Sequence, residues 1–427
     1  MERQLRPLFA PFSGAILGLA LLLCLPVSGW SASFSLNSDT LLGVFSPNSK
    51  TAVPGYEYLQ VDAGSLKDKG LSFHAYGWGR VDFADSGYYD SQSDGELLYG
   101  YLEYANALNN FDLKVGRQYI FEGIGNQSID GARVAFDLSP YFTVSAYGGQ
   151  PVALDSTQGR SGDSTFGGRI GNHFGSRYNL GVSYKVVNNN GTEQDQKLGV
   201  DLNAVLPFGA TLSGFSSYNL RTDGWGEHSY ELRFSVADFD FRPFFEHFRY
   251  EDYFGTGVAS ASPFTLLATT DETLTSYGTD ILWRKFDNWD IGAKFKGYSY
   301  DKGTTDAAYY YGGLLTWHGE GLTQVGGELG RMDGDQDRDR YILTRAYFYY
   351  DQLPKALPIK FVTGDLVYAY YDQAIYNENN ALFLSLGVGQ NFLKNKLQVK
   401  LSGDYSSDPY YDSNLRGMLT AKYTFDM

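Results

Sequence analysis

Apolar and polar residues alternate along most of this chain. In residues 197–206, the side chains of Leu198, Val200 and Leu202 lie on one side of an extended backbone, and those of Lys197 and Asp201 lie on the other. The same alternation recurs in residues 177–186, 289–297 and 419–427. A period of two residues is typical of a β-strand with one apolar face. The pattern therefore predicts an all-β protein.

The connections between the predicted strands differ in length in a regular way. Short turns, such as the one at Asn109 and Asn110, alternate with longer polar or glycine-rich connections. The longer connections include residues 122–128, 149–164, 188–196, 251–272, 372–380 and 406–413. Tight turns at one end and long loops at the other are typical of transmembrane barrels. The runs predict about 18–20 strands, with 20 as the preferred number.

A closed barrel also explains how a chain of low hydropathy can cross a membrane. Mean hydropathy is −0.30, and no stretch after the N-terminal region is long and apolar enough for a membrane helix. In hydrocarbon every backbone polar group needs a partner, so strands cross only as a closed sheet. We therefore predict a transmembrane antiparallel up-and-down β-barrel with short periplasmic turns and long extracellular loops. A soluble sandwich, propeller or solenoid is the alternative.

The N-terminal residues have the layout of a secretory signal peptide. Arg3 and Arg6 precede a short apolar run, and small residues follow Pro26. We predict a signal peptide over residues 1–33, with cleavage between residues 29 and 33. The single Cys, Cys24, lies in the part that would be removed. The mature chain would then have no disulfide, no cysteine metal ligand and no covalently attached haem, and no cofactor is predicted.

Residues 34–69 precede the first clear strand pattern of the predicted barrel. They are too few for a separate domain with its own core. One strand-like piece lies at residues 56–62. We predict an N-terminal periplasmic extension or a partial plug, with an additional strand as the third alternative. Residues 70–427 are assigned to the barrel.

Aromatic content and charge refine this picture. The chain has 35 Tyr and 29 Phe residues, and amphipathic rings sit well at the two membrane interfaces. Several tyrosines fall near predicted strand ends, at residues 88–89, 309–311, 349–350, 370–371 and 410–411. The formal net charge of −15 argues against a nucleic-acid partner, because phosphate binding needs a surplus of Lys and Arg.

Three segments resemble those of Gram-negative outer-membrane porin-like barrels. Residues 417–427 alternate toward the aromatic Phe425, although the last residue, Met427, is not aromatic. Residues 77–82 and 115–118 are similar to the opening hairpins of uncharacterised porin-like proteins of metal-respiring bacteria. The resemblance implies residence in the outer membrane and contact with its lipid and lipopolysaccharide. Assembly into homo-oligomers is an open alternative.

A set of charged residues falls on the less apolar face of the predicted strands. A charge that faced hydrocarbon near the membrane midplane would cost about 2–4 kcal/mol, so these side chains are expected to face a water-filled lumen. The candidate pore-lining residues are Arg80, Asp82, Lys114, Arg169, Lys185, Glu231, Arg233, Lys294, Lys296 and Lys400. Residues 149–164 or residues 251–272 are the loops that would fold inward if a loop narrows the lumen.

These features predict a porin, a passive diffusion channel for small hydrophilic solutes or ions. The alternative is a structural sleeve around multihaem cytochromes in an outer-membrane electron conduit. No enzymatic activity is predicted, since the five His residues are scattered and no nucleophile motif occurs. Residues 333–339 begin like a calcium loop but have Arg338 in place of the sixth-position Gly, so no metal site is predicted.

Overall fold

The computed structural model describes residues 33–46, 50–66, 69–84, 87–107, 109–152, 162–254, 271–301, 305–354 and 356–427. The predicted signal peptide, apart from Ser33, lies outside these residues. So do the central parts of the two predicted inward loops, residues 149–164 and 251–272. Within the described ranges, no helix is both long and apolar enough to cross a membrane.

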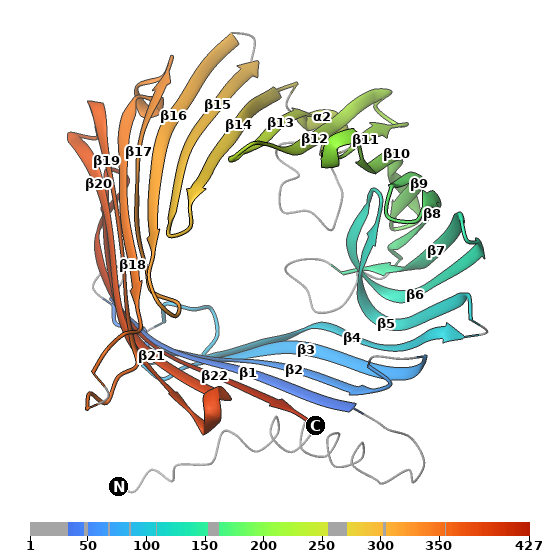
Figure 1. The fold of residues 1–427 in the computed structure, drawn as a ribbon. Coiled ribbons are helices and arrows are strands. Elements are labelled where there is room, and N and C mark those ends of the chain that lie inside the picture. The colour runs from blue at the N-terminus through green and yellow to red at the C-terminus, as the bar shows by residue number, and fades with distance from the viewer. Residues whose placement is uncertain are drawn as a thin grey trace, which may run out of the picture.

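Twenty-two antiparallel strands form one sheet that closes into a ring (Figure 1). The strands are β1 (Ser33–Phe45), β2 (Pro54–Gly64), β3 (Gly70–Asp82), β4 (Ser93–Ala107), β5 (Phe111–Glu122), β6 (Gly125–Ser139), β7 (Phe142–Pro151), β8 (Ser164–Phe174), β9 (Tyr178–Asn189), β10 (Thr192–Val205), β11 (Thr211–Asn219), β12 (Gly224–Val236), β13 (Phe239–Arg249), β14 (Thr273–Phe286), β15 (Trp289–Asp301), β16 (Thr305–His318), β17 (Gln324–Gly334), β18 (Tyr341–Tyr350), β19 (Phe361–Ile375), β20 (Glu378–Phe392), β21 (Leu397–Asp408) and β22 (Tyr411–Asp426). Among the described residues, the helices are α2 (Tyr250–Phe254) and the short 3-10 helices Pro207–Gly209, Asp337–Asp339 and Leu393–Asn395. The predicted class, an all-β antiparallel barrel, is confirmed.

The first and last strands close the ring. β1 pairs with β22 from Ser35 opposite Asp426 to Phe45 opposite Arg416. Beyond this ladder, the N–H of Phe34 donates to the carbonyl of Met427 at 3.1 Å, and the N–H of Met427 donates back at 2.9 Å. The sheet therefore has no free edge at this seam.

The count of 22 strands corrects the preferred number of 20. The two further strands are β1 and β2, which make up most of residues 34–69 and pair with each other from Ser33 opposite Gly64 to Leu42 opposite Gly55. β2 also pairs with β3, so this segment belongs to the wall. It is neither a periplasmic extension nor a partial plug, and the third alternative, an additional strand, describes it better.

Several strands run further than their sequence pattern indicates. Four connections on the side away from the termini were expected to be long but contain two residues each, at 123–124, 190–191, 376–377 and 409–410. Asn190 and Gly191 have φ values of 48° and 77°, as a two-residue hairpin requires. The flanking polar residues form ladder pairs, such as Thr192 with Asn189. The prediction of long extracellular loops is therefore wrong for these four hairpins.

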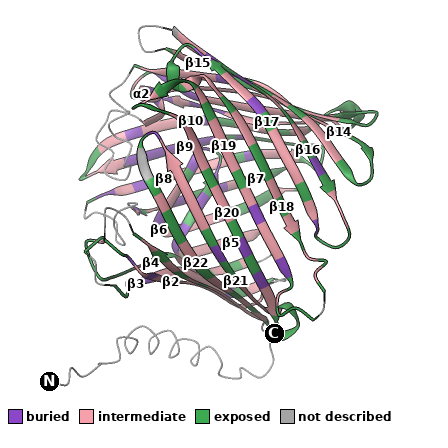
Figure 2. Cartoon of the chain, turned by 90° about the vertical axis from the view of Figure 1, so that its left-hand side faces the viewer, coloured by how far each residue is buried: buried purple, intermediate pink, exposed green. Residues whose placement is uncertain are grey.

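The two faces of the sheet differ in chemistry. Exposed apolar side chains such as Leu71, Val182 and Leu329 share one face, here called the outer face. Figure 2 shows that buried residues are sparse along the strands, because the ring encloses no conventional core. Twenty-two strands about 4.8 Å apart and tilted by about 40° give a backbone diameter of about 44 Å.

Candidate functional site

The inner face of the sheet carries all ten candidate lining residues. Their ladder positions alternate with those of the outer-face apolar residues, as for Lys294 beside Phe295 on β15. The inner-face residues are Arg80, Asp82, Lys114, Arg169, Lys185, Glu231, Arg233, Lys294, Lys296 and Lys400. Their surroundings divide them into three groups.

The first group consists of charges that are paired on the inner face, within one strand or with a strand one or two positions along the sheet. The pairs are Lys114 with Glu103 at 3.3 Å, Arg169 with Asp201 at 2.5 Å, Glu231 with Arg233 and with Arg242, Lys294 with Glu328 at 2.7 Å, and Arg345 with Asp365 at 2.6 Å. Together they form a belt of charges of both signs around much of the inner wall. Arg345 is 46% exposed, so space for solvent lies in front of it. This is a wet wall on which most charges are balanced.

The second group consists of free cations. Lys296 lies over the ring of Phe244, with 5.7 Å from its Nζ to the ring centroid. In the described part of the chain, neither Lys296 nor Lys400 forms an ion pair with a carboxylate. These two lysines therefore contribute net positive charge to the inner wall.

The third group is buried. Arg80 is 6% exposed and its guanidinium lies 3.7 Å from the ring centroid of Tyr89. Asp82 accepts hydrogen bonds from the N–H groups of Val53 at 2.9 Å and Ala84 at 3.0 Å. Burial, with the hydrogen bond to Tyr56, raises the pKa of the loop residue Tyr89. Arg80 and Asp82 thus contact the segments before β2 and after β3, at the end of the barrel away from the termini.

The end of the β5–β6 hairpin leaves the wall and turns into the ring (Figure 1). Three glycines in one ladder row, Gly116, Gly131 and Gly149, mark the bend. A Cβ on Gly131 would lie 2.1 Å from the carbonyl oxygen of Gly148, and one on Gly149 would lie 2.4 Å from that of Asp130. Only glycine allows the backbones to approach this closely.

Apolar contacts hold the inward hairpin against the inner face of the neighbouring strands. Ile120 and Ile129 have no exposed surface and form a buried cluster with Tyr147 of β7. The tip residue Ile124 lies over β10, where a Cβ on Gly199 would be 2.2 Å from its side chain. This cluster takes the place of a core in an otherwise hollow fold.

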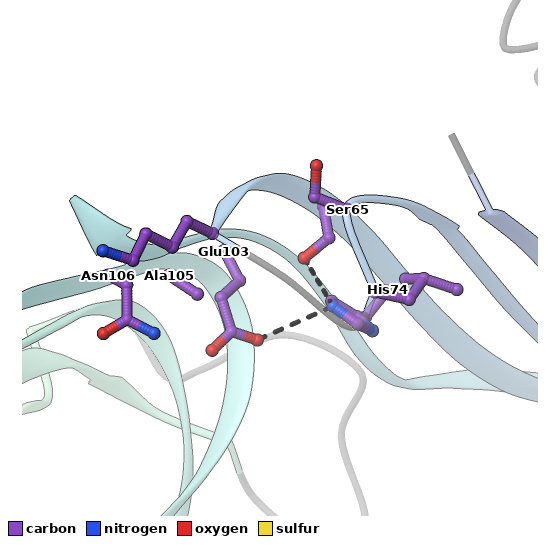
Figure 3. Close-up of a pocket in the computed structure, with 8 residues that line it drawn as sticks. Ser65, His74, Glu103, Ala105 and Asn106 are labelled. Carbon is purple, nitrogen blue, oxygen red and sulfur yellow. Dashed lines mark hydrogen bonds and ion pairs between the residues drawn. The ribbon is translucent and has the colours of Figure 1, made fainter. Parts of the chain in front are cut away.

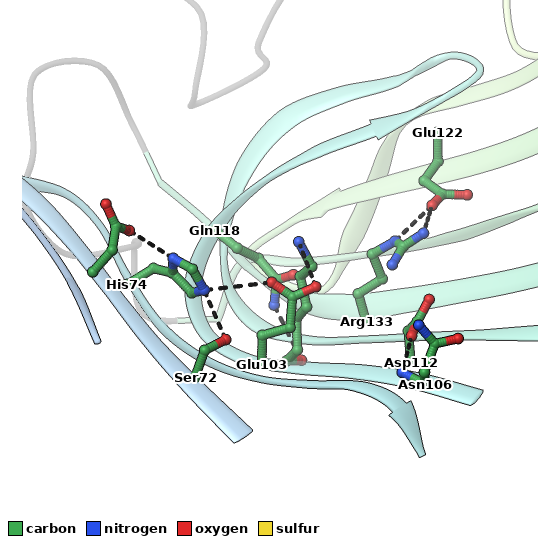
Figure 4. A network of polar contacts seen from close by, with 10 residues as sticks. Ser72, His74, Glu103, Asn106, Asp112, Gln118, Glu122 and Arg133 are labelled. Carbon is green, nitrogen blue, oxygen red and sulfur yellow. Dashed lines mark hydrogen bonds and ion pairs between the residues drawn. The ribbon is translucent and has the colours of Figure 1, made fainter. Parts of the chain in front are cut away.

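Polar contacts add to this docking (Figure 4). Arg133 Nε donates to Glu122 Oε1 at 2.6 Å, and Ser145 also donates to Glu122. At the tip, the N–H of Ile124 donates to Ser183 Oγ at 3.2 Å. Lys185, predicted to line the pore, is only 8% exposed and lies on β9 two residues from Ser183, which binds the hairpin tip.

Helix α2 meets the hairpin from the other side. Asn219 of β11 donates to the carbonyl of Asp252 at 2.9 Å, which ties α2 to the inner face. Arg249 contacts the buried Asp252 carboxylate at 3.2 Å. Burial raises the pKa of Tyr253, and a hydrogen bond with Asn126 of the hairpin opposes this shift. The hairpin tip and α2 together narrow the lumen at the end away from the termini.

Two cavities open on the inner face. One of about 460 Å³ lies under the hairpin tip and is lined by Gly123, Asp201, Phe215 and Glu231, among others. The other, of about 410 Å³, lies between β3 and β4 toward the termini and includes Ser72, His74 and Glu103 (Figure 3). Among the described residues, no group of three His, Cys, Asp or Glu side chains has the arrangement of a metal site.

Comparison with known proteins gives likeness of fold alone. No family model matches the sequence, and no curated protein matches it. The solved structure of the siderophore receptor PirA from Pseudomonas aeruginosa is 14% identical over 91% of this chain and 80% of that chain, with a TM-score of 0.54. OccAB2 from Acinetobacter baumannii and OccK2 (OpdF) from Pseudomonas aeruginosa are each 10% identical over 93% of this chain and 98% of theirs, with TM-scores of 0.46.

Proposed function

We propose that this protein is an outer-membrane channel for the passive diffusion of small hydrophilic solutes or ions. One observation carries the proposal: a closed 22-strand sheet has an apolar outer face and a charged, solvent-exposed inner face. Such a sheet satisfies its backbone in lipid while enclosing water. Since diffusion along a wet wall needs no reacting group, the channel is not an enzyme.

The proposed location in the outer membrane follows from the chemistry of the two faces of the sheet. The apolar outer surface fits a lipid bilayer, with lipopolysaccharide at its outer leaflet, and the predicted signal peptide would direct export. Barrels of this size leave an aqueous lumen unless something folds into it. The proposed constriction is the β5–β6 hairpin with α2, in place of a long loop. A homo-oligomeric assembly stays a prediction.

Conductance of the purified protein in planar lipid bilayers tests the channel. Discrete open-state current steps are expected. A barrel that folds but stays electrically silent would contradict the channel. If such a silent barrel also copurified with multihaem cytochromes, the alternative of a structural sleeve would replace it. No feature of the described residues favours that sleeve.

The free inner cations give a selectivity prediction. The double substitution Lys296→Glu and Lys400→Glu is expected to raise the cation-to-anion permeability ratio roughly threefold, because two unpaired positive charges become negative. The measurement is the reversal potential in a KCl gradient. Lys394→Glu is the matched control, since Lys394 lies exposed in the turn before β21 and should leave the ratio unchanged. An unchanged reversal potential in the double variant would show that the two lysines do not line the ion path.

A further inference from the structure

Aromatic side chains form a continuous file on the inner face of β2, β3 and β4. Neighbouring ring centroids are 5.0–6.4 Å apart along the whole file. In order, the rings are Trp78, Tyr56, Tyr58, Tyr76, Tyr99, Tyr101 and His74. We call this set the aromatic file. None of these rings is fully buried, so each presents surface to the lumen.

The strand register places the aromatic file diagonally across the wall. Tyr58 is opposite Trp78, Tyr76 is opposite Tyr99, and His74 is opposite Tyr101. The file therefore begins toward the end away from the termini and descends across three strands. Tyrosines were expected mainly at the membrane interfaces, but these face inward, where a membrane gives no reason for them.

Polar residues flank the aromatic file on both sides. Above it, Arg80 and Asp94 form an ion pair at 3.9 Å. Below it, Asp62 contacts His74 Nδ1 at 2.6 Å, and Gln60 donates to Asp62 at 2.9 Å. Arg80 is buried, but the exposed Asp94 above the rings and Gln60 and Asp62 below them can exchange hydrogen bonds with a ligand that lies on the rings.

Most charges along the aromatic file are balanced. Asp39 pairs with Lys422 at 3.6 Å, and Glu103 pairs with Lys114 at 3.3 Å. Of the acids nearest to the rings, all but Glu96, which lies opposite Trp78 and has no ion pair among the described residues, thus already have cationic or His partners. A charged ligand would have to compete with these pairs, whereas a neutral one would not. The electrostatics favour an uncharged ligand rich in hydroxyl groups.

The lower end of the aromatic file opens into the 410 Å³ cavity. Ser72 and His74 line this cavity with Glu103, and Ser72 Oγ lies 2.8 Å from His74 Nε2. Ser65 and Asn106 add hydroxyl and amide groups (Figure 3). A ligand that follows the rings would reach a polar pocket with donors and acceptors on several sides.

We propose that the aromatic file binds neutral oligosaccharides and guides them through the lumen. The apolar C–H face of a sugar ring packs on an aromatic face, while its hydroxyl groups bond to the flanking polar side chains. Successive rings at 5.0–6.4 Å let a linear chain of sugars move from one ring to the next without losing contact. The inference rests on the proposed channel for access to the lumen.

The test measures how maltohexaose blocks the ion current through single channels in planar bilayers. Saturable, reversible block is expected for the wild-type protein. The double variant Tyr76→Ala and Tyr99→Ala should lower the association constant for block by about tenfold, because two stacking faces are lost. Tyr76→Phe with Tyr99→Phe keeps the rings and should keep most of the block.

The matched control removes another pair of inward tyrosines. The ring centroids of Tyr341 on β18 and Tyr371 on β19 are 5.6 Å apart, and both residues lie outside the aromatic file. Their replacement by Ala should leave the block unchanged. Retained heat-modifiable migration on gels establishes that each variant is folded. Equal block in the Tyr76/Tyr99 and Tyr341/Tyr371 variants would overturn the assignment to the aromatic file.

A second readout separates this inference from the proposed channel. Trp78 is the first ring, so maltohexaose should change the tryptophan fluorescence of the wild-type protein but not of Trp78→Phe. Normal conductance with neither block nor fluorescence change would overturn the inference and leave the channel intact. A fluorescence change in a protein that never conducts would support the binding site and contradict the channel.

Discussion

Removing the end of the β5–β6 hairpin is expected to raise single-channel conductance to roughly one and a half to two times the wild-type value. The change replaces residues 118–129 by Asn-Gly, which joins Arg117 to its ladder partner Asp130 through a two-residue turn. The hairpin lies inside the ring and covers β7 to β10, so its loss widens the narrowest part of the lumen.

The same variant should expose Lys185. Lys185 is buried in the native protein and lies two residues from Ser183, which binds the hairpin tip, so amine-reactive labelling of Lys185 is expected only after the deletion. A matched control shortens the β19–β20 hairpin by replacing residues 371–379 with Asn-Gly, since this hairpin continues the wall. Equal conductance in wild type and the β5–β6 variant would show that the hairpin does not limit the current.

Gly131→Ala is expected to lower the free energy of unfolding by about 2 kcal/mol. Its Cβ would lie 2.1 Å from the Gly148 carbonyl oxygen and 2.7 Å from the Gly149 Cα. Both are backbone atoms, so relief requires the hairpin to shift away from β7. Urea unfolding in lipid vesicles, followed by tryptophan fluorescence, measures the loss.

Gly313→Ala provides the comparison for this substitution. Gly313 lies in β16, and a Cβ there would meet only the Gly292 carbonyl oxygen at 3.8 Å, an ordinary contact. Its effect on stability should be within about 0.5 kcal/mol. If both substitutions cost the same, the close approach at Gly131 is not what shapes the bend.

The sequence pattern is informative about the faces of strands and less so about their ends. The alternation around Leu198 and Val200 correctly predicts which side chains face outward in the observed ladder. A slip of one residue would turn these apolar side chains inward, so the pattern specifies the register. Strand ends were misjudged because polar residues near Asn188 and Asn380 read as loop, although the ladder pairs them. β1 and β2 were missed for a related reason, since Ser38 and Glu57 interrupt their outer faces.

The inward hairpin depends on contacts that no local pattern contains. Its bend needs Gly116, Gly131 and Gly149 in one row, and the register that aligns them appears only once three strands have paired. One signal was available. Ile120 and Ile129 are large apolar residues on the polar face of their strands, which is unexpected for a wet wall and reasonable for a surface that packs against another.

The seam between β1 and β22 has a consequence for how the ring is made. Its partners, such as Ser35 and Asp426, are farther apart along the chain than those of any neighbouring hairpin. Loop-closure entropy makes such a contact slow to form, so ring closure is expected to be the last step of assembly. Until then both strands present unpaired edges, which are templates for pairing with other chains. Whatever shields those two edges during insertion therefore decides whether the sheet closes on itself or joins another.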